Sequence, residues 1–282
     1  MKKPNLPIAC ILFGAVFFSC SQQKQTDNWT SLFNGQDLSG WDTYIGPLYS
    51  AEVGDFDGER IGLNNDPAGV FTVVQEDGQP ALKISGEQFG GISTVESFEN
   101  YHLQLQFKWG EKKYAPRDSA KRDSGLLYHA GGPHGVDWFF WMKSQEFQIQ
   151  EGDCGDYWGL GSDVKIRAKM NADSTYTYDP KSDPVAFGAN SAQRNAKKYP
   201  DAEKPSGEWN TLDLYTVGTT STHVVNGVLT MILEDSSQPV DGVASPLTKG
   251  KIQIQSEGAE VYYRNIRMEP IDTIPAEILG GK

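Results

Sequence analysis

The amino-acid sequence predicts an all-β chain folded as a sandwich of two sheets. Many short segments alternate polar and apolar residues or are rich in β-branched and aromatic side chains, and turn residues separate them. No long segment has the 3.6-residue apolar period of an amphipathic helix. The chain has 282 residues, of which 38% are hydrophobic, which suits one large β domain and no separate second domain.

The expected strands follow one another along the whole chain. They cover residues 71–74, 81–85, 101–109, 124–129, 211–217, 221–225, 228–233, 250–255 and 261–268, together with the alternating stretch 144–153. Asn226-Gly227 predicts a tight hairpin, because both residues tolerate a positive φ. Residues 167–205 break the pattern with many Asn, Asp, Ser, Lys and Pro residues. Such a long irregular stretch is typical of a binding loop or lid, or else of a mobile surface decoration.

The first residues have the pattern of an export signal. Lys2 and Lys3 precede an apolar run at residues 8–18, which is too short to span a bilayer well. Ser19-Cys20 then matches a lipoprotein cleavage site, in which the cysteine is acylated. A plain secretory signal is the alternative.

These patterns predict the domain organisation and the location. Residues 1–19 are the signal peptide, residues 20–28 are the lipidated Cys20 with a flexible tether, residues 29–271 are a single β-sandwich domain, and residues 272–282 are a tail. The expected location is the cell envelope of a bacterium, with the membrane bound through the N-terminal lipid. The periplasmic side is favoured, because no acidic residue follows Cys20 in residues 21–25.

Cysteine content and net charge restrict the function further. Once Cys10 has left with the signal and Cys20 carries lipid, only Cys154 remains, so the exported chain has no internal disulfide. The formal net charge of −12 argues against nucleic acid as a partner, because nucleic acid requires clustered Lys and Arg. An uncharged oligosaccharide or glycoside is compatible with this charge.

One predicted strand carries a row of polar side chains. Strand alternation places Glu146, Gln148 and Gln150 on one face and Phe147 and Ile149 on the other. A face that presents carboxylate and amide groups in a row offers both hydrogen-bond donors and acceptors. Because every sugar hydroxyl needs both, a carbohydrate is the ligand that this row suits best.

Six motifs occur in order along the chain. They are residues 29–41 (WTSLFNGQDLSGW), 123–125 (DSG), 146–149 (EFQI), 207–210 (GEWN), 226–227 (NG) and 263–266 (YRNI). With them the chain resembles the DUF1080 family, also called 3-keto-disaccharide hydrolase, which has a concanavalin A-like jelly-roll fold. The sequence departs from the family pattern at Asp123, where the family has Asn, in an insert at 111–121, in the aromatic loop 138–141, and after Arg167. These departures bear on the identity of the substrate more than on the fold.

The resemblance implies a reaction. The family is similar to enzymes that cleave glycosides already oxidised at C3. A ketone at C3 acidifies the proton on C2, a base removes that proton, and the C1 substituent leaves by β-elimination. Water adds afterwards, so the net result is hydrolysis. This chemistry needs a base, a group that holds the enolate oxygen and a proton donor for the leaving oxygen.

The candidate catalytic residues are His129 and Glu146. His129 ends a predicted strand and is a natural base near neutral pH, or a metal ligand, or else a structural histidine. Glu146 projects from the polar row, where the alternative is a solvated side chain. We expect both side chains to face the cleft. The candidate substrate-binding residues are Asp123, Gln148, Trp138, Trp141, Trp158, His134 and Arg264. The three tryptophans offer stacking platforms for sugar rings, and Arg264 either holds an enolate oxygen or forms a salt bridge within the sheet.

A cofactor is not required by any motif, but one acidic cluster is a candidate cation site. Glu151, Asp153 and Asp156 offer oxygen ligands for a divalent metal such as Ca²⁺, although their spacing is not that of an EF-hand. The same cluster is also compatible with a turn or with the rim of the site. Two other functions stay open: a lectin-like module that only binds glycan, and a conventional two-carboxylate glycoside hydrolase that uses Glu146 with Glu151. Strand alternation places these two residues on opposite faces.

Overall fold

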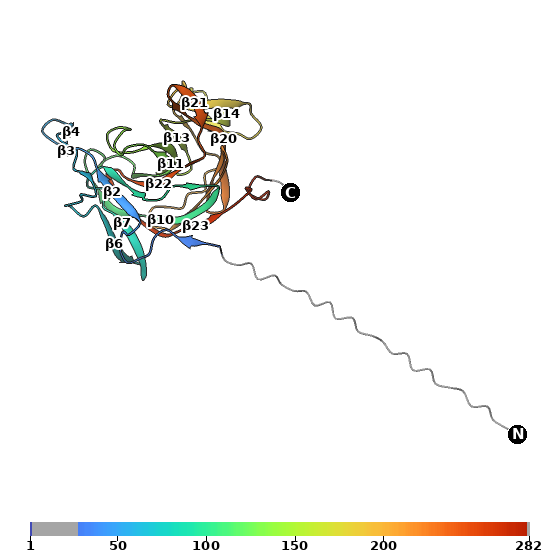
Figure 1. The fold of residues 1–282 in the computed structure, drawn as a ribbon, viewed down its shortest axis with the longest axis horizontal. Helices are drawn as coiled ribbons and strands as arrows, with labels where there is room; N and C mark the ends of the chain where they lie inside the picture. The colour runs from blue at the N-terminus through green and yellow to red at the C-terminus, as the bar shows by residue number, and fades with distance from the viewer. Residues whose placement is uncertain (2–27, 281–282) are drawn as a thin grey trace.

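The computed structural model describes residue 1 and residues 28–280, and these residues form a β-sandwich (Figure 1). Two large antiparallel sheets of twelve and nine strands account for most of the chain. The predicted signal peptide and lipidated Cys20 fall on residues 2–27, which lie outside the described residues. Between residues 28 and 280 no helix is long and apolar enough to cross a membrane.

The larger sheet has a central path of nine strands with three more paired to it. The path runs in the order β15 (Tyr176–Tyr178), β14 (Asp163–Met170), β20 (Val228–Val240), β19 (Thr220–Val225), β18 (Asn210–Val217), β10 (Tyr101–Lys113), β23 (Ala259–Pro270), β7 (Gln79–Ile84) and β6 (Phe71–Glu76). The paired strands are β1 (Thr30–Ser31) on β23, β16 (Pro184–Gly188) on β14 and β21 (Val243–Pro246) on β20.

The smaller sheet carries the polar row. Its order is β17 (Asn195–Ala196), β13 (Tyr157–Leu160), β12 (Lys143–Gln150), β11 (Asp123–Gly131), β22 (Lys249–Ser256), β8 (Gly90–Thr94), β2 (Trp41–Ile45) and β5 (Gly62–Leu63), with β9 (Phe98–Glu99) paired to β22. A separate hairpin, β3 (Leu48–Ser50) with β4 (Asp55–Asp57), projects from one side of the sandwich in Figure 1.

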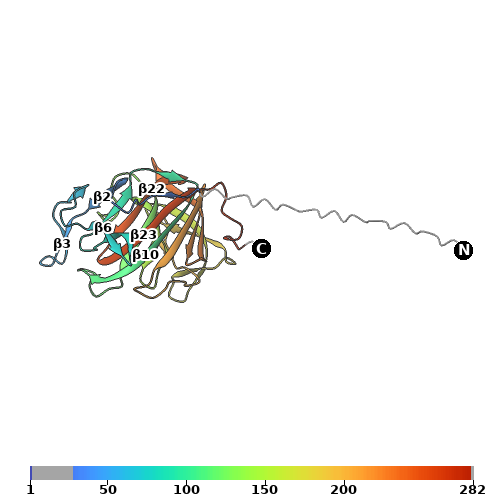
Figure 2. The same ribbon diagram turned by 90° about the horizontal axis from the view of Figure 1, so that it is seen from below.

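The chain passes repeatedly between the two sheets. It leaves the larger sheet after β10 to form β11, β12 and β13, returns for β14, and crosses again at β22 before ending in β23. In Figure 2, β10 and β23, which pair in the larger sheet, lie below β22 of the smaller sheet. Such crossing of antiparallel strands between two packed sheets is the architecture of a jelly roll. The predicted all-β, two-sheet jelly-roll sandwich is confirmed.

A continuous hydrophobic core fills the space between the sheets. Leu105 and Phe107 of β10 meet Phe147 and Ile149 of β12 in one buried cluster. All four side chains are fully buried, and burying each aliphatic or aromatic group of this size stabilises the fold by roughly 1.5–3 kcal/mol. Because Phe147 and Ile149 face the core, the residues that alternate with them along β12 must face outward.

The hairpin at Asn226-Gly227 has the predicted geometry. It joins β19 to β20, and its two residues have φ values of 51° and 79°, as a two-residue hairpin turn with both central residues at positive φ requires. Residues 167–205 are not one irregular loop, because β15, β16 and β17 lie within them. Their strands extend the edges of both sheets.

Candidate active site

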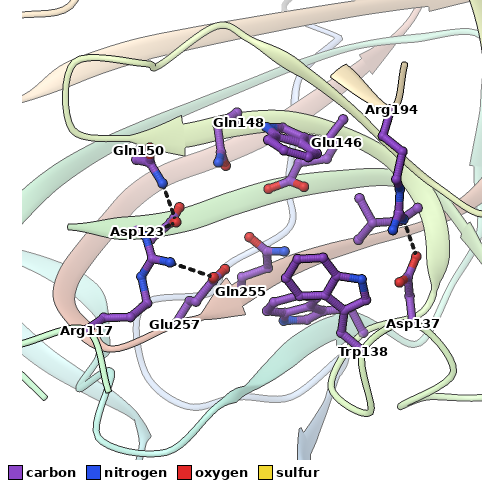
Figure 3. Close-up of a pocket in the computed structure, with 13 residues that line it drawn as sticks. Arg117, Asp123, Asp137, Trp138, Glu146, Gln148, Gln150, Arg194, Gln255 and Glu257 are labelled. Carbon is purple, nitrogen blue, oxygen red and sulfur yellow. Dashed lines mark hydrogen bonds and ion pairs between the residues drawn. The ribbon is translucent and has the colours of Figure 1, made fainter. Parts of the chain in front are cut away.

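The outward-facing residues of β12 line a pocket on the smaller sheet (Figure 3). Glu146, Gln148 and Gln150 alternate with the core residues Phe147 and Ile149 and face this pocket. The pocket has a volume of ≈ 160 Å³. Its lining residues are Arg117, Asp123, Asp137, Trp138, Trp141, Glu146, Gln148, Gln150, Trp158, Leu160, Arg194, Gln255 and Glu257. The alternation therefore produces the outward-facing polar row that the sequence predicts.

Glu146 lies in the middle of the pocket in Figure 3. Its side chain is only 5% exposed, and no hydrogen bond to its carboxyl from the described residues contributes to its pKa. Burial raises the pKa of Glu146 well above its usual range, and the negative charges of Asp123 and Asp137 raise it further. An unpaired buried carboxyl of this kind is suited to proton transfer near neutral pH.

A glycine on the neighbouring strand makes room for the Glu146 carboxyl. Gly125 of β11 lies below the Glu146 carboxyl and the Gln255 amide, and a Cβ at position 125 would overlap Oε1 of both side chains. The strand pairs β11 with β12 on one side and with β22 on the other, which brings the two side chains over the same backbone position. Only glycine permits this approach.

One end of the pocket holds a cluster of two carboxyl groups and one guanidinium. Arg117 Nη2 lies 2.5 Å from Asp123 Oδ2, and Arg117 Nη1 lies 3.6 Å from Glu257 Oε1. Burial raises the pKa of Asp123 to about 7, although the charge of Arg117 and a hydrogen bond from Gln150 oppose the rise. Burial, with the charge of Asp123, raises the pKa of Glu257 well above its usual range. One guanidinium thus stabilises one ionised carboxylate, and we assign the proton to Glu257 because Asp123 has the closer contact.

The other end of the pocket holds a second cation. Arg194 Nη2 lies 3.2 Å from Asp137 Oδ2 and also donates to the backbone carbonyl of Gly159. The guanidinium of Arg194 lies 5.9 Å from the centroid of the Trp138 ring. Burial raises the pKa of Asp137, against the charge of Arg194. Because the charge of Arg194 also acts on Glu146, the central carboxyl lies between a cation at each end of the pocket.

The remaining polar and aromatic groups match a sugar. Asp123 Oδ1 and Gln255 Oε1 are buried acceptors without a hydrogen-bond partner among the described residues, and buried polar groups normally have one. Trp138, Trp141 and Trp158 also line the pocket. Indole faces stack on apolar ring surfaces, while hydroxyl groups satisfy acceptors such as these. This lining is the combination that a carbohydrate needs.

A family model matches residues 28–269 and is described as a 3-keto-alpha-glucoside-1,2-lyase-like domain. The chain belongs to this family. As a 3-keto-alpha-glucoside-1,2-lyase-like protein it is a member of a carbohydrate-active family, and the resemblance drawn from the motifs is confirmed. No curated protein sequence matches the chain.

Several solved structures are similar in chain path. A candidate glycosyl hydrolase from Parabacteroides distasonis ATCC 8503 is 19% identical, with 89% of this chain and 98% of that chain covered and a TM-score of 0.48. The carbohydrate binding module CBM66 from Bacillus subtilis is 9% identical, with 82% and 95% covered and a TM-score of 0.43. A mixed linkage glucan GH16 protein from Bacteroides ovatus is 9% identical, with 86% and 98% covered and a TM-score of 0.43. At these TM-scores the similarities carry no conclusion about activity.

His129 does not reach the pocket of this 3-keto-alpha-glucoside-1,2-lyase-like protein, contrary to the expectation that it faces the cleft. A β-bulge interrupts β11 between Tyr128 and Gly131, and His129 adopts a φ of 51°. The imidazole is 1% exposed, packs against Tyr101 and Tyr128, and has no hydrogen-bond partner for either ring nitrogen among the described residues. Burial lowers its pKa to about 4, so it is neutral at pH 7.

Two predicted substrate-binding residues also lie outside the pocket. His134 is half-buried, is hydrogen-bonded to the hydroxyl of Ser93 at 2.9 Å and stacks on Tyr44. Arg264 belongs to β23 of the larger sheet, where its guanidinium lies 3.8 Å from the centroid of the Trp209 ring. It is therefore not an enolate-binding group of this pocket. Among residues 28–280 it forms no salt bridge, but it stacks on Trp209 and donates a hydrogen bond to Gln106 Oε1.

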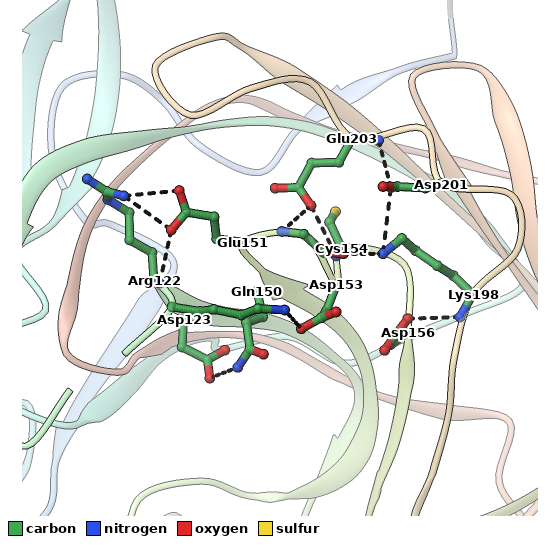
Figure 4. A network of polar contacts seen from close by, with 12 residues as sticks. Arg122, Asp123, Gln150, Glu151, Asp153, Cys154, Asp156, Lys198, Asp201 and Glu203 are labelled. Carbon is green, nitrogen blue, oxygen red and sulfur yellow. Dashed lines mark hydrogen bonds and ion pairs between the residues drawn. The ribbon is translucent and has the colours of Figure 1, made fainter. Parts of the chain in front are cut away.

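The acidic cluster lies outside the pocket, with Asp156 buried and Glu151 and Asp153 partly exposed. Arg122 Nη1 lies 3.1 Å from Glu151 Oε1, and Lys121 Nζ lies 2.5 Å from Asp153 Oδ2 (Figure 4). Asp156 accepts a backbone N–H at 2.8 Å. Among residues 28–280 no group of three or more His, Cys, Asp or Glu side chains is arranged to hold a metal ion. Glu151 and Glu146 are not brought together, so this pair is not the two-carboxylate site of a conventional hydrolase.

Seven pocket residues were not among the predicted site residues, although one of them, Gln150, belongs to the predicted polar row. They are Arg117, Asp137, Gln150, Leu160, Arg194, Gln255 and Glu257. The spacing of Gln253, Gln255 and Glu257 along the end of β22 repeats the polar alternation of β12, and this signal was available in the sequence. Arg117 and Arg194 come from the 111–121 insert and the 167–205 segment, which composition singles out without indicating a particular residue.

Proposed function

We propose that the protein cleaves glycosides oxidised at C3, by removal of the C2 proton and elimination of the C1 substituent, with net hydrolysis. Membership in a 3-keto-alpha-glucoside-1,2-lyase-like family supports the reaction type. The observation that carries the proposal is the Glu146 carboxyl: it is buried, has a raised pKa and lies at the centre of a pocket lined by sugar-compatible groups.

Glu146 is the proposed base. The charge of Arg194 favours the ionised form of Glu146 against the effect of burial. This form removes the proton from C2, and the electron pair of that C–H bond forms the enolate between C2 and C3. A carboxyl with a raised pKa is a stronger base than an ordinary one, which suits a weakly acidic C–H bond. Arg194 is the proposed partner of the negative charge that develops on the C3 oxygen, because its guanidinium lines the pocket and its charge reaches Glu146.

Glu257 is the proposed acid. When the enolate reforms the C3 carbonyl, a double bond forms between C1 and C2 and the bond from C1 to the leaving oxygen breaks. The leaving oxygen takes the proton of Glu257, whose pKa burial raises well above its usual range. Water then adds across the C1–C2 double bond, with its proton to C2 and its hydroxyl to C1, which yields the free 3-keto sugar. Arg117 and Asp123 hold Glu257 in place through their shared ion-pair cluster.

The test compares a 3-keto-glucoside with its unoxidised parent under the same conditions, with product release as the readout. The proposal expects turnover of the ketosugar alone. Cleavage of the unoxidised parent supports a conventional glycoside hydrolase instead. Binding of the ketosugar without turnover, with and without added divalent metal, supports a lectin-like module for this substrate class.

We also propose that the protein acts at the bacterial cell envelope, anchored by a lipid on Cys20 and facing the periplasm. The support is the Ser19-Cys20 sequence directly after the apolar run, and the lack of acidic residues in the stretch that follows. Such an anchor places the domain on a tether beside the membrane, where a small glycoside reaches it by diffusion.

A further inference from the structure

A second groove adjoins the pocket and differs from it in chemistry. It has a volume of ≈ 450 Å³, and four residues line both spaces: Arg117, Trp138, Trp141 and Glu257. Six of its ten lining residues are aromatic, and a proline adds to them. The polar pocket therefore opens at Glu257, the proposed acid, into a larger and more apolar groove.

The aromatic side chains of the groove form a continuous surface. The rings of Phe56, Phe89 and Phe140 contact one another with centroid separations of 4.7, 4.7 and 5.4 Å. Phe139 lies beside them with 60% of its surface exposed, and the guanidinium of Arg60 lies 5.5 Å from its ring centroid. Phe89 and Phe140 are buried beneath the groove, and the rings that it leaves largely open to solvent are Trp138, at 59%, and Phe139. Exposed aromatic rings beside a pocket are a mark of a binding surface.

Few polar groups of this groove are free to bind a sugar. Arg117 and Glu257 contact each other at the junction, and the remaining polar lining residue, Asp55, belongs to the exposed rim of the β3–β4 hairpin. A second sugar would leave most of its hydroxyl groups without protein partners, which costs binding free energy. An aromatic group would instead bury its surface against Phe56, Phe89 and Phe139.

We propose that the groove binds the leaving group of the glycoside and that this group is an aromatic aglycone rather than a second sugar. The inference rests on the proposed function, because Glu257 at the junction is the group that protonates the leaving oxygen. The hairpin 48–57, the insert 111–121 and the aromatic loop 138–141 build the groove. The insert and the aromatic loop are departures from the family pattern, so this specificity belongs to this chain.

The test measures binding of unreactive probes by calorimetry, so that it does not depend on turnover. The probes are phenyl α-glucoside, methyl α-glucoside and maltose, none of which carries a C3 ketone. Phenyl α-glucoside is expected to bind about tenfold more tightly than the other two, which is the scale of one well-packed aromatic contact. Phe139→Ala is expected to remove this preference and to leave the affinity for methyl α-glucoside unchanged. Met170→Ala is the matched control, because Met170 is equally exposed at 59% and lines neither space.

Each outcome decides the proposal. Equal affinities for the three probes, absence of binding at millimolar concentrations, or tighter binding of maltose overturns it, the last in favour of a second sugar site. A phenyl preference that survives Phe139→Ala overturns the placement in this groove. Failure to turn over any 3-keto-glucoside rejects the proposed function alone, since the phenyl preference of the unreactive probes is measured separately.

Discussion

Gly125 lies directly beneath the carboxyl group of Glu146, and a Cβ at position 125 would overlap Oε1 of that carboxyl. Glycine at this position of β11 is therefore a requirement of the pocket and not of the strand, since Gly125 needs no unusual φ. Each residue of the Asp123-Ser124-Gly125 motif therefore has a structural role. Its aspartate ends the pocket, its serine hydroxyl bonds to Tyr263 inside the core at 2.7 Å, and its glycine seats the proposed base.

Gly125→Ala is expected to lower kcat on a 3-keto-glucoside by about 10²-fold, because a small displacement of a reacting group has effects of this size. The melting temperature should change much less, because the overlapping atoms are the ends of flexible side chains that can move aside. Gly131→Ala is the matched control: Gly131 ends the same strand, and a Cβ there meets nothing within 4 Å. Normal activity in Gly125→Ala would show that Glu146 does not need its present position.

Glu146→Gln is expected to lower kcat on a 3-keto-glucoside by ~10²-fold or more, the usual effect of removing a general base. The affinity for the substrate should change much less, because the amide keeps the shape of the carboxyl. Glu151→Gln changes a neighbouring carboxyl on the surface, held by Arg122 outside the pocket, and should keep wild-type turnover. Full activity in Glu146→Gln would move the search for the base to Asp123 and Glu257.

The sequence was sufficient to predict the sandwich and half of the pocket. Because Phe147 and Ile149 of β12 are buried, strand alternation makes Glu146 and Gln148 face outward. This rule uses only neighbouring residues of one strand. The tryptophans at 138, 141 and 158 followed from their position beside the same strand. Local rules of this kind fail where the chain departs from regular geometry.

Two failures have distinct physical causes. A β-bulge at His129 turns its side chain into the core, and no residue pattern marks that bulge. Arg117 and Arg194 reach the pocket from long segments whose paths depend on tertiary contacts, such as the Arg194 hydrogen bond to Gly159. Neither arginine can be assigned to the pocket from the sequence, because residues far apart in the chain, such as 117 and 257, meet only after folding.

His129→Asn is expected to keep the kcat of the wild-type protein, because the imidazole lies in the core and does not line the pocket. Asparagine is chosen because it tolerates the positive φ at this position. The melting temperature should fall, since the ring contacts with Tyr101 and Tyr128 are lost. A fall in kcat of ~10²-fold with an unchanged melting temperature would instead restore His129 as a catalytic residue.

Cys20→Ser is expected to release the protein from the membrane. In fractionated cells the wild-type protein should stay with the membrane after a high-salt wash, because an acyl anchor is held by hydrophobic burial and not by charge. The variant should appear in the soluble periplasmic fraction with its activity intact. Membrane association of Cys20→Ser after the wash would contradict the lipoprotein assignment.

Glu146 should also make the stability of the protein depend on pH. Burial raises the pKa of Glu146 in the folded state, while in the unfolded chain a glutamate has its ordinary pKa of about 4.3. Between these two values the folded state holds a proton that the unfolded state has lost. The free energy of unfolding therefore falls as the pH rises through this window.

Glu146→Gln removes this dependence, so the variant should gain stability relative to the wild type as the pH rises above the ordinary glutamate pKa of about 4.3. Denaturant unfolding of both proteins at several pH values checks this expectation. Glu151→Gln should show the opposite trend at lower pH. Burial raises the pKa of Glu151, but hydrogen bonds from Ser206 and Arg122 outweigh it and lower that pKa overall. The wild-type carboxylate therefore stabilises the folded state as the pH rises from that lowered pKa to the ordinary value of about 4.3, and the variant loses this gain. Parallel curves for Glu146→Gln and the wild type would mean that Glu146 ionises normally in the folded protein, and the proposed base would lose its raised pKa.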